Sequence, residues 1–277
     1  MRLLLLLPLA PLATIASDRT FEVSAAAGRG GAGHQSSTPR LSSSMPALRI
    51  SSAFQIPVAS PRVAIDEYCR GLVGYEIVPT TPLGREIAHR GWHITSEVRI
   101  GSHVAVGYVR TLVAGTSAIC YPVEGHVAIA ERGRLVAIIS NAREPREENL
   151  VEEAGIGEVH LVPGTHNLRI SDDTGPTPPM AELRIGTGEV HIVQLAARDP
   201  ICRGRAFVPN IYGQRLPAAS RVLERFGWRR SRRSTEYQGC SGTGAGYCLF
   251  TYARGRRSID VITAWESRVV ARFTPHC

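Results

Sequence analysis

The chain of 277 residues contains no lysine, so arginine supplies all 32 of its basic residues. Without lysine the protein can form no Schiff base, no Walker-type phosphate loop and no serine–lysine dyad. A Cys-x-x-Cys pair is also absent, which argues against a zinc ribbon and a thioredoxin-type redox site. These absences exclude several common classes of site before any fold is considered.

Long hydrophobic runs are missing after the first residues. "MRLLLLLPLAPLATIAS", residues 1–17, has one arginine, an apolar run and then small residues, which is typical of a signal peptide. Cleavage is expected after Ala16 or Ser17, or at a later site near residues 25–27. The run is too short and too broken by proline to span a bilayer, so we expect no membrane span after cleavage and a secreted or periplasmic protein.

Composition divides the rest of the chain. Residues 18–60 are rich in Gly, Ser, Ala and Pro and bury too little apolar surface to offset their chain entropy, which predicts a disordered tether. Residues 61–200 and 201–277 are then expected to form a body and a C-terminal module.

All six cysteines lie beyond the tether, and an even number in an exported chain favours disulfides. Six cysteines allow 15 pairings, and the sequence alone does not choose among them. The pairing we favour is Cys240–Cys248 across a short loop, Cys202–Cys277 across the module, and Cys69–Cys120 by elimination.

The body reads as one or two helices and many strands. Ser60 and Pro61 can begin one helix, and Thr81 and Pro82 can begin another that stops at Gly91. Alternating runs such as "HITSEVRI", "HVAVGYVRTLVA", "HVAIAE" and "RLVAIIS" follow, separated by turns. The expected body is therefore β-rich, with antiparallel strands.

The C-terminal module begins with a helix. Leu216, Ala219, Leu223 and Phe226 fall on one helical face, and Gly227 is placed to end the helix. Four short candidate strands follow: "RSTEYQG", "YCLFTYAR", "SIDVITAWE" and "RVVARFT". The predicted class is thus α+β: a β-rich body, then a helix plus a four-stranded antiparallel meander, stabilised by disulfides.

Two resemblances accompany this pattern. The spacing V-P-x3-G-x5-A-x3-L-x3-G-W over residues 208–228, which ends with Trp228, resembles the opening of the PASTA repeat, a module of cell-wall-sensing and penicillin-binding proteins that implies peptidoglycan binding. The cysteines and an additional strand depart from that repeat. Two helices that end in Gly-Trp, at Gly91–Trp92 and Gly227–Trp228, give a layout similar to the tandem modules of secreted β-lactamase inhibitory proteins.

The most conspicuous motif is "YQGCSGTGAGYC", residues 237–248. A phosphate-binding loop should open a helix, whereas "YCLFTYAR" alternates like a strand. The hydrolase motif G-x-S-x-G fails because Thr243 replaces its last glycine, which weakens Ser241 as a nucleophile. A hairpin tip closed by Cys240–Cys248 accounts for the glycines most simply.

No metal or cofactor site is predicted. His89 and His93 are four residues apart but are separated by Gly91, and no H-E-x-x-H motif occurs. His160, His166 and His191 lie on or beside expected strands and could converge only through the fold.

Positive charge is concentrated in the module. Residues 201–277 hold fourteen arginines and four acidic residues, whereas the preceding residues are slightly acidic. Such clustering indicates an anionic partner, although a basic face that only favours solubility is the alternative. The predicted binding residues are Arg229, Arg230, Arg232, Arg233, Arg256 and Arg257, with Trp228 and Trp265 as apolar anchors.

We therefore expect an exported, non-catalytic binding or cell-envelope protein whose module contacts an anionic polymer or an acidic protein. Nucleic acid is not an expected physiological partner, because the chain is exported. The alternatives are a secreted protein-binding inhibitor and a secreted hydrolase, and the latter requires a histidine beside Ser241 or beside a pair of carboxylates. Ligand identity and oligomeric state are left open by the sequence.

Overall fold

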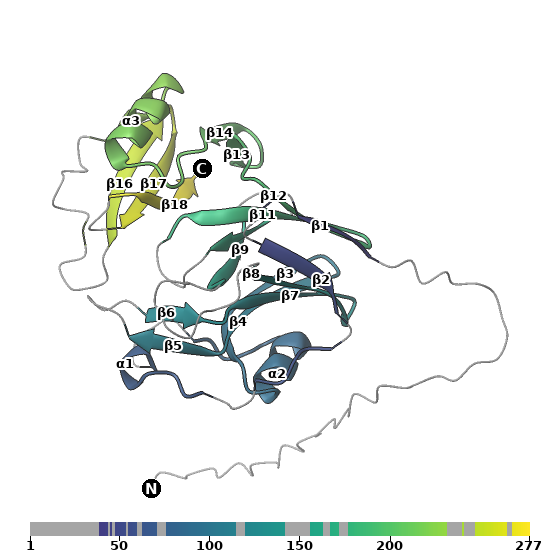
Figure 1. The fold of residues 1–277 in the computed structure, drawn as a ribbon. Helices are drawn as coiled ribbons and strands as arrows, with labels where there is room; N and C mark the ends of the chain where they lie inside the picture. The colour runs from purple at the N-terminus through teal and green to yellow at the C-terminus, as the bar shows by residue number, and fades with distance from the viewer. Residues whose placement is uncertain are drawn as a thin grey trace, which may run out of the picture. The chain divides into compact units, whose positions relative to one another are not determined.

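Two five-stranded sheets lie face to face in the computed structural model of the chain (Figure 1). The structure describes residues 39–43, 45, 48–53, 55–59, 63–70, 76–114, 120–141, 156–162, 167–171, 177–231, 240, 247–264 and 268–277. The first sheet has the order β1-β12-β11-β10-β9, with bounds Arg40–Ser43, Glu189–Val193, Pro179–Gly186, Leu168–Ser171 and Glu158–Leu161. The second has the order β2-β8-β7-β4-β3, with bounds Leu48–Ser52, Arg134–Asn141, His126–Glu131, His103–Val109 and His93–Ile100.

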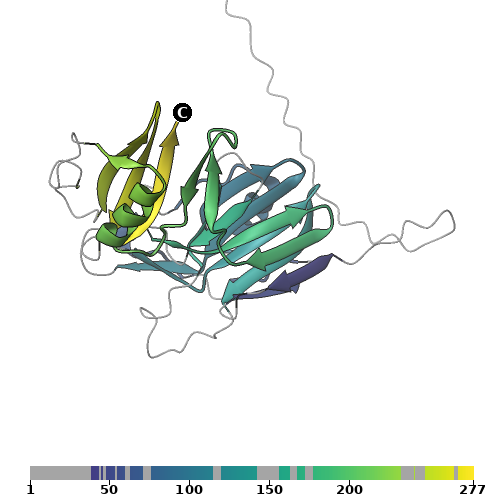
Figure 2. The same cartoon turned by 90° about the horizontal axis from the view of Figure 1, so that it is seen from above.

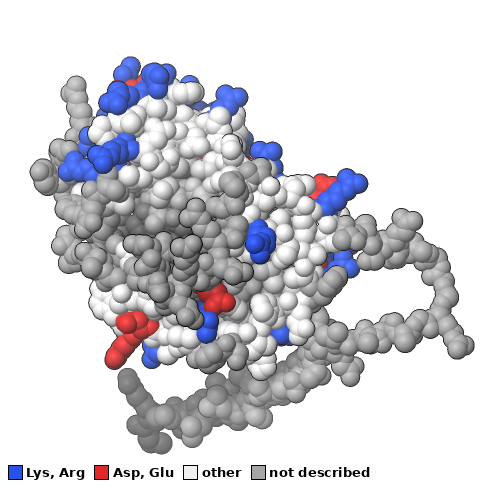
Figure 3. All heavy atoms as spheres, viewed as in Figure 1, with Lys and Arg blue, Asp and Glu red and all other residues white. Residues whose placement is uncertain are grey.

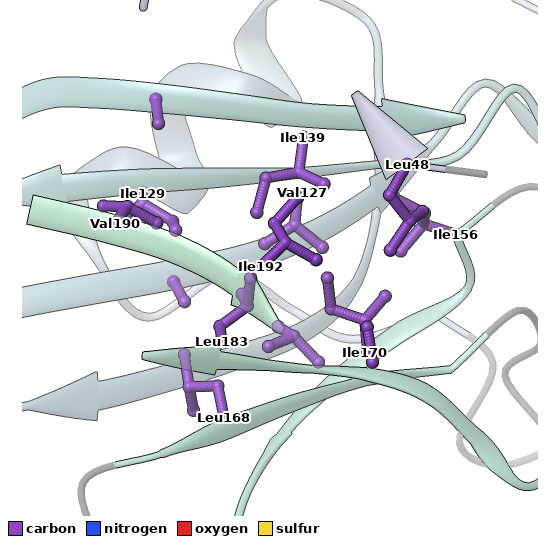
Figure 4. Packing of buried hydrophobic residues seen from close by; sticks show 14 of the residues in the cluster. Leu48, Val127, Ile129, Ile139, Ile156, Leu168, Ile170, Leu183, Val190 and Ile192 are labelled. Atoms are coloured by element: carbon purple, nitrogen blue, oxygen red, sulfur yellow. The ribbon is translucent and has the colours of Figure 1, made fainter. Parts of the chain in front are cut away.

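One extended hydrophobic core lies between these sheets. Leu168, Ile170 and Ile192 of the first sheet and Val127 and Ile139 of the second are completely buried, and Figure 4 shows their side chains meeting in one layer. Alternate residues on each strand face this layer, as the period of a strand requires. The body is thus a β-sandwich, and the turned view in Figure 2 shows its two layers.

Helix α2 (Pro82–His89) covers the outer face of the second sheet. The Thr81 hydroxyl accepts a hydrogen bond from the Gly84 amide at 2.9 Å, and Pro82 occupies the first helical turn, so the sequence supplies its own start signal. The chain leaves the helix at Gly91, whose φ of 94° suits glycine. Ile87 then packs against Trp92 in the core beneath the helix.

A smaller cluster surrounds the first disulfide. Helix α1 (Glu67–Arg70) and the hairpin of β5 (Thr111–Ala114) and β6 (Cys120–Val123) enclose it. The predicted strand over residues 103–114 is divided at Arg110, and its second part pairs in a separate sheet.

A hairpin of β13 (Arg198–Ile201) and β14 (Ala206–Pro209) leads into the C-terminal module. Helix α3 (Leu216–Arg225) follows, and then comes an antiparallel sheet with the order β15-β16-β17-β18. Its strands are Arg229–Arg230, Tyr247–Arg254, Arg257–Ala264 and Val270–His276. Leu216, Ala219 and Leu223 of α3 share one core with Phe250 and Val261 of the sheet.

The fold corrects three expectations, and a fourth falls outside the described residues. Arg40–Ser43 and Leu48–Ser52 are strands at the edges of the two sheets, so the disordered tether predicted over residues 18–60 is wrong there. The predicted boundary at residues 200 and 201 falls inside β13. The first strand of the last sheet is β15, whereas the strand expected at residues 233–239 lies outside the described residues. Phe226 is 47 % exposed rather than part of the buried helix face.

The predicted strand-rich α+β class is confirmed, and so are the three cysteine pairs. Their Cα–Cα distances are 5.8 Å for Cys69–Cys120, 5.5 Å for Cys202–Cys277 and 3.9 Å for Cys240–Cys248. Disulfides persist in oxidising compartments, which indicates a protein that resides outside the cytoplasm. Among the helices that the structure describes, none has the length and apolar character to cross a membrane.

Candidate functional site

Two hairpin tips of the C-terminal part carry the same short sequence. The turn between β13 and β14 reads Arg203-Gly204-Arg205, and the turn between β16 and β17 reads Arg254-Gly255-Arg256. Gly204 and Gly255 have φ values of 78° and 61°, a region that glycine enters without strain. Each glycine therefore closes a tight turn that holds arginines on both sides of it.

The Cys202–Cys277 disulfide brings the two tips together. Cys202 precedes the first tip, and Cys277 directly follows β18. Strand β18 pairs with β17 so that Ser258 lies opposite His276, next to the second tip. The cross-link therefore holds both turns at the same end of the sheet.

A groove of about 940 Å³ lies between these tips, and it is the candidate site. We call it the arginine groove; five of its nine lining residues are Arg203, Arg205, Arg254, Arg256 and Arg257. Among the described residues, no acidic side chain lines the groove and none of the five arginines forms an ion pair. The groove is therefore strongly cationic, a surface that attracts anions.

Figure 3 shows arginines gathered over the part of the molecule that α3 and β16 occupy in Figure 1. Guanidinium groups bind carboxylates and phosphates through paired hydrogen bonds and keep their charge at every physiological pH. The groove can therefore hold an anionic group, and its described lining consists of arginines, a glycine, a proline and the disulfide.

The predicted binding residues fall into three groups. Arg256 and Arg257 line the groove. Arg229 and Arg230 are exposed on edge strand β15, where Arg229 pairs with Ala253, next to the second tip. Arg232, Arg233 and Trp265 lie outside the described residues.

Trp228 is not a surface anchor. Its side chain is completely buried in the core of the module, and its indole N–H donates to the Phe207 carbonyl at 3.3 Å. A residue that fills the core beneath a helix is out of reach of a surface ligand, so the expectation for Trp228 is corrected.

Arg203, Arg205 and Arg254 were missed by the sequence analysis. The available signal was the repeated Arg-Gly-Arg turn together with the expected Cys202–Cys277 pair, which joins one such turn to the last strand. The motif alone is not sufficient, because Arg132-Gly133-Arg134 forms the turn between β7 and β8 and does not line the groove.

One serine, one histidine and one glutamate of the first sheet lie in a row that partly resembles the site a hydrolase would need. The Ser42 hydroxyl lies 2.7 Å from His191 Nδ1, and His191 Nε2 lies 3.6 Å from a Glu189 carboxylate oxygen. Ser42, His191 and Glu189 lie on the edge of the sheet where β1 pairs with β12, and Glu189 also contacts Arg40 at 3.5 Å. Neither of the two described cavities is lined by these residues. This row is a cross-strand contact on an open surface and has none of the enclosure that acyl transfer requires.

The other residues of that alternative give no further support. Ser241 and His166 lie outside the described residues, as do the glycines between Cys240 and Cys248. His160 lies in a separate cavity beside Arg169. Among the described residues there is also no group of three or more His, Cys, Asp or Glu side chains placed to hold a metal ion.

Comparisons of the chain with protein-family models, with curated proteins and with solved structures find no match. The geometry and charge of the arginine groove therefore provide the basis for a functional proposal.

Proposed function

We propose that the chain is an exported, non-catalytic binding protein of the cell envelope that holds an anionic polymer in the arginine groove. The observation that carries this proposal is the convergence of Arg203, Arg205, Arg254, Arg256 and Arg257 on one groove, whose described lining includes no acidic side chain. Arginines that only served solubility would have no reason to converge on a groove held by a disulfide.

The compartment supports this choice of partner. The signal-like residues 1–17 and the three disulfides fit a protein that folds outside the reducing cytoplasm. Envelope polymers that carry phosphate or carboxylate groups are the abundant anions there. The PASTA-like segment at residues 208–228 also favours an envelope polymer over an acidic protein.

The groove suits a repeating anion better than a single small one. Each exposed ion pair contributes only about 0.2–1 kcal/mol, so one contact gives little retention. A polymer that engages several arginines at once adds these contributions and raises the effective concentration of each further contact. Arg229 and Arg230 on β15 extend the positive surface beyond the groove.

Retention on isolated cell wall and envelope at rising salt tests the proposal. We expect the protein to bind at low ionic strength and to be released as salt screens the arginines. The double variant Arg203→Gln with Arg205→Gln is expected to bind about tenfold more weakly. Neither residue is buried, so thermal unfolding should be unchanged.

The matched control is Arg132→Gln with Arg134→Gln, which removes the same two charges from the same Arg-Gly-Arg turn type on the body. This variant is expected to bind like the unmodified protein. Retention that does not respond to salt, or an equal loss in the control, would exclude binding through the groove.

A further inference from the structure

A second cavity lies where the outer face of the first sheet meets the C-terminal module. It measures about 180 Å³ and is lined by residues of β9, β10 and β18 together with Thr177 and Tyr212. This is smaller than the ~300–1,000 Å³ of pockets for drug-sized ligands. Any occupant is therefore a small molecule rather than a polymer.

The register of the sheet builds the polar wall of this cavity. Arg169 of β10 pairs with His160 of β9 on one side and with Glu182 of β11 on the other, so the three residues form a row. Their chain neighbours, such as Leu168, face the core of the sandwich. The row therefore lies on the outer face, against the segment that leads into the module.

Arg169 is completely buried yet only partly satisfied. Its Nη2 contacts the carboxylates of Asp199 and of Glu182, the latter at 3.6 Å, and its guanidinium lies 4.6 Å from the centre of the Tyr212 ring. Its Nε and Nη1 donors have no acceptor among the described residues. The Thr177 hydroxyl, which lines the same cavity, is buried and without a partner in the same sense.

Buried donors without acceptors are rare in folded proteins, and a group of them around one cavity is explained by a bound water, ion or ligand. Water could fill a polar cavity of this size. The remaining walls are apolar, however, with Leu161, Val162 and Phe273 among the lining residues. A polar end beside an apolar wall fits an amphipathic molecule better than water alone.

The field inside the cavity is positive near His160. Burial, together with the nearby charges of Arg169 and Arg272, lowers the pKa of His160 to about 4, so its ring is neutral at neutral pH. The carboxylates of Asp199 and Glu182 approach Arg169 at Nη2, away from its two free donors. Glu158 is the one acidic residue among the described residues that line the cavity.

We propose that this cavity binds a small organic carboxylate. The carboxylate group lies among Arg169, Arg272 and the Thr177 hydroxyl, and a short apolar body lies against Phe273. This site is independent of the arginine groove, with which it shares no lining residue.

Benzoate and its neutral analogue benzamide are the probes. Their binding to the full chain is measured by NMR of the histidine ring signals. Benzoate should bind saturably, and its negative charge should raise the pKa of His160. Benzamide, which has the same shape and no charge, should bind at least tenfold more weakly. Equal binding of the two probes, or no effect of benzoate on His160, would overturn the proposal.

Two variants locate the carboxylate. Arg272→Gln changes an exposed residue and should weaken benzoate about tenfold, and Thr177→Val removes one hydroxyl and should weaken it about fivefold. Arg99→Gln removes an exposed arginine from β3 and should leave the affinity unchanged. If Arg272→Gln and Thr177→Val bind benzoate like the unmodified protein, the cavity holds only water.

Discussion

The Glu97 carboxylate lies in the space that a β-carbon on Gly84 would occupy. Glu97 projects from β3 to the start of α2, where it accepts hydrogen bonds from the amides and hydroxyls of Thr80 and Thr81. In a capping box this role belongs to a glutamate at the third helical position. Here that position is Gly84, and a strand supplies the carboxylate instead, so one side chain caps the helix and ties it to the sheet.

Gly84→Ala is expected to displace Glu97 and to lower the free energy of unfolding by about 1–2 kcal/mol, even though alanine favours a helix. Urea denaturation of the single variants and of the double variant with Glu97→Gln measures the coupling. Glu97→Gln should cost much less in the Gly84→Ala background than alone. Additive losses would show that the two residues do not compete for the same space.

Acid should weaken this cap. Burial raises the pKa of Glu97, but the hydrogen bonds from Thr80 and Thr81 outweigh it, so the pKa lies below the ordinary value of 4.5 for a glutamate. The stabilisation by the carboxylate is therefore complete above that value and is lost as the pH falls through the lower pKa of the folded state. The difference in unfolding free energy between the unmodified protein and Glu97→Gln should shrink over this acidic range. A difference that stays constant down to about pH 3 would contradict the assignment.

Gly125 makes a second close approach, this time to a backbone. A β-carbon at Gly125 would overlap the main chain of Ile156, which cannot move aside as a side chain can. Gly125→Ala should therefore destabilise the sandwich by about 3 kcal/mol. Gly186→Ala is the matched control, because a β-carbon there would make only an ordinary contact with Glu189 Cβ at 3.9 Å, and its effect should stay within about 0.5 kcal/mol. Thermal unfolding of both variants gives the comparison.

Arg169 and Arg184 both contact Glu182, but at very different depths. The Arg169 side chain is 1 % exposed, and the Arg184 side chain is 58 % exposed. Arg169→Met leaves Asp199 buried without its counter-charge and leaves Glu182 only the exposed Arg184, so it should cost about 3–5 kcal/mol. Arg184→Met should cost less than about 1 kcal/mol. Chemical denaturation distinguishes the two, and equal losses would mean that the buried network is not what joins this sheet to the segment before α3.

Much of the fold follows from local signals in the sequence. Thr81, Pro82 and Gly91 define α2 to within a residue, and Gly227 directly follows the last turn of α3. The alternating runs at residues 93–100 and 126–131 are strands with these same bounds. Caps and alternation act over a few residues, so a single sequence contains them.

Features of the fold that depend on residues far away in the sequence were harder to predict from the sequence. Strand β1, "RLSS", has one apolar residue and is ordered by its parallel pairing with β12, which lies about 150 positions later. The sequence of residues 103–114 predicts one continuous strand, but the strand is divided at Arg110. The Arg110 amide donates a hydrogen bond to the Val123 carbonyl at the point where the chain passes from one sheet to another. Neither the pairing of β1 with β12 nor the hydrogen bond of Arg110 can be predicted from the local composition.

The candidate sites show the same division. The sequence shows that arginine is concentrated in the last quarter of the chain. Which of these arginines line one groove depends on the Cys202–Cys277 disulfide and on the register of β17 with β18. The cavity beside Arg169 had no sequence signal. "NLRIS" reads as an ordinary strand, and the burial of its arginine depends on Asp199, which lies 30 residues later.

The position of β1 and β2 matters to anyone who shortens this protein. A truncation before residue 61, where composition suggests a natural boundary, would strip the outermost strand from each half of the sandwich. Unprotected backbone along β12 and β8 would then be free to pair with neighbouring molecules. Such a fragment should aggregate, and its failure would say nothing about either ligand site.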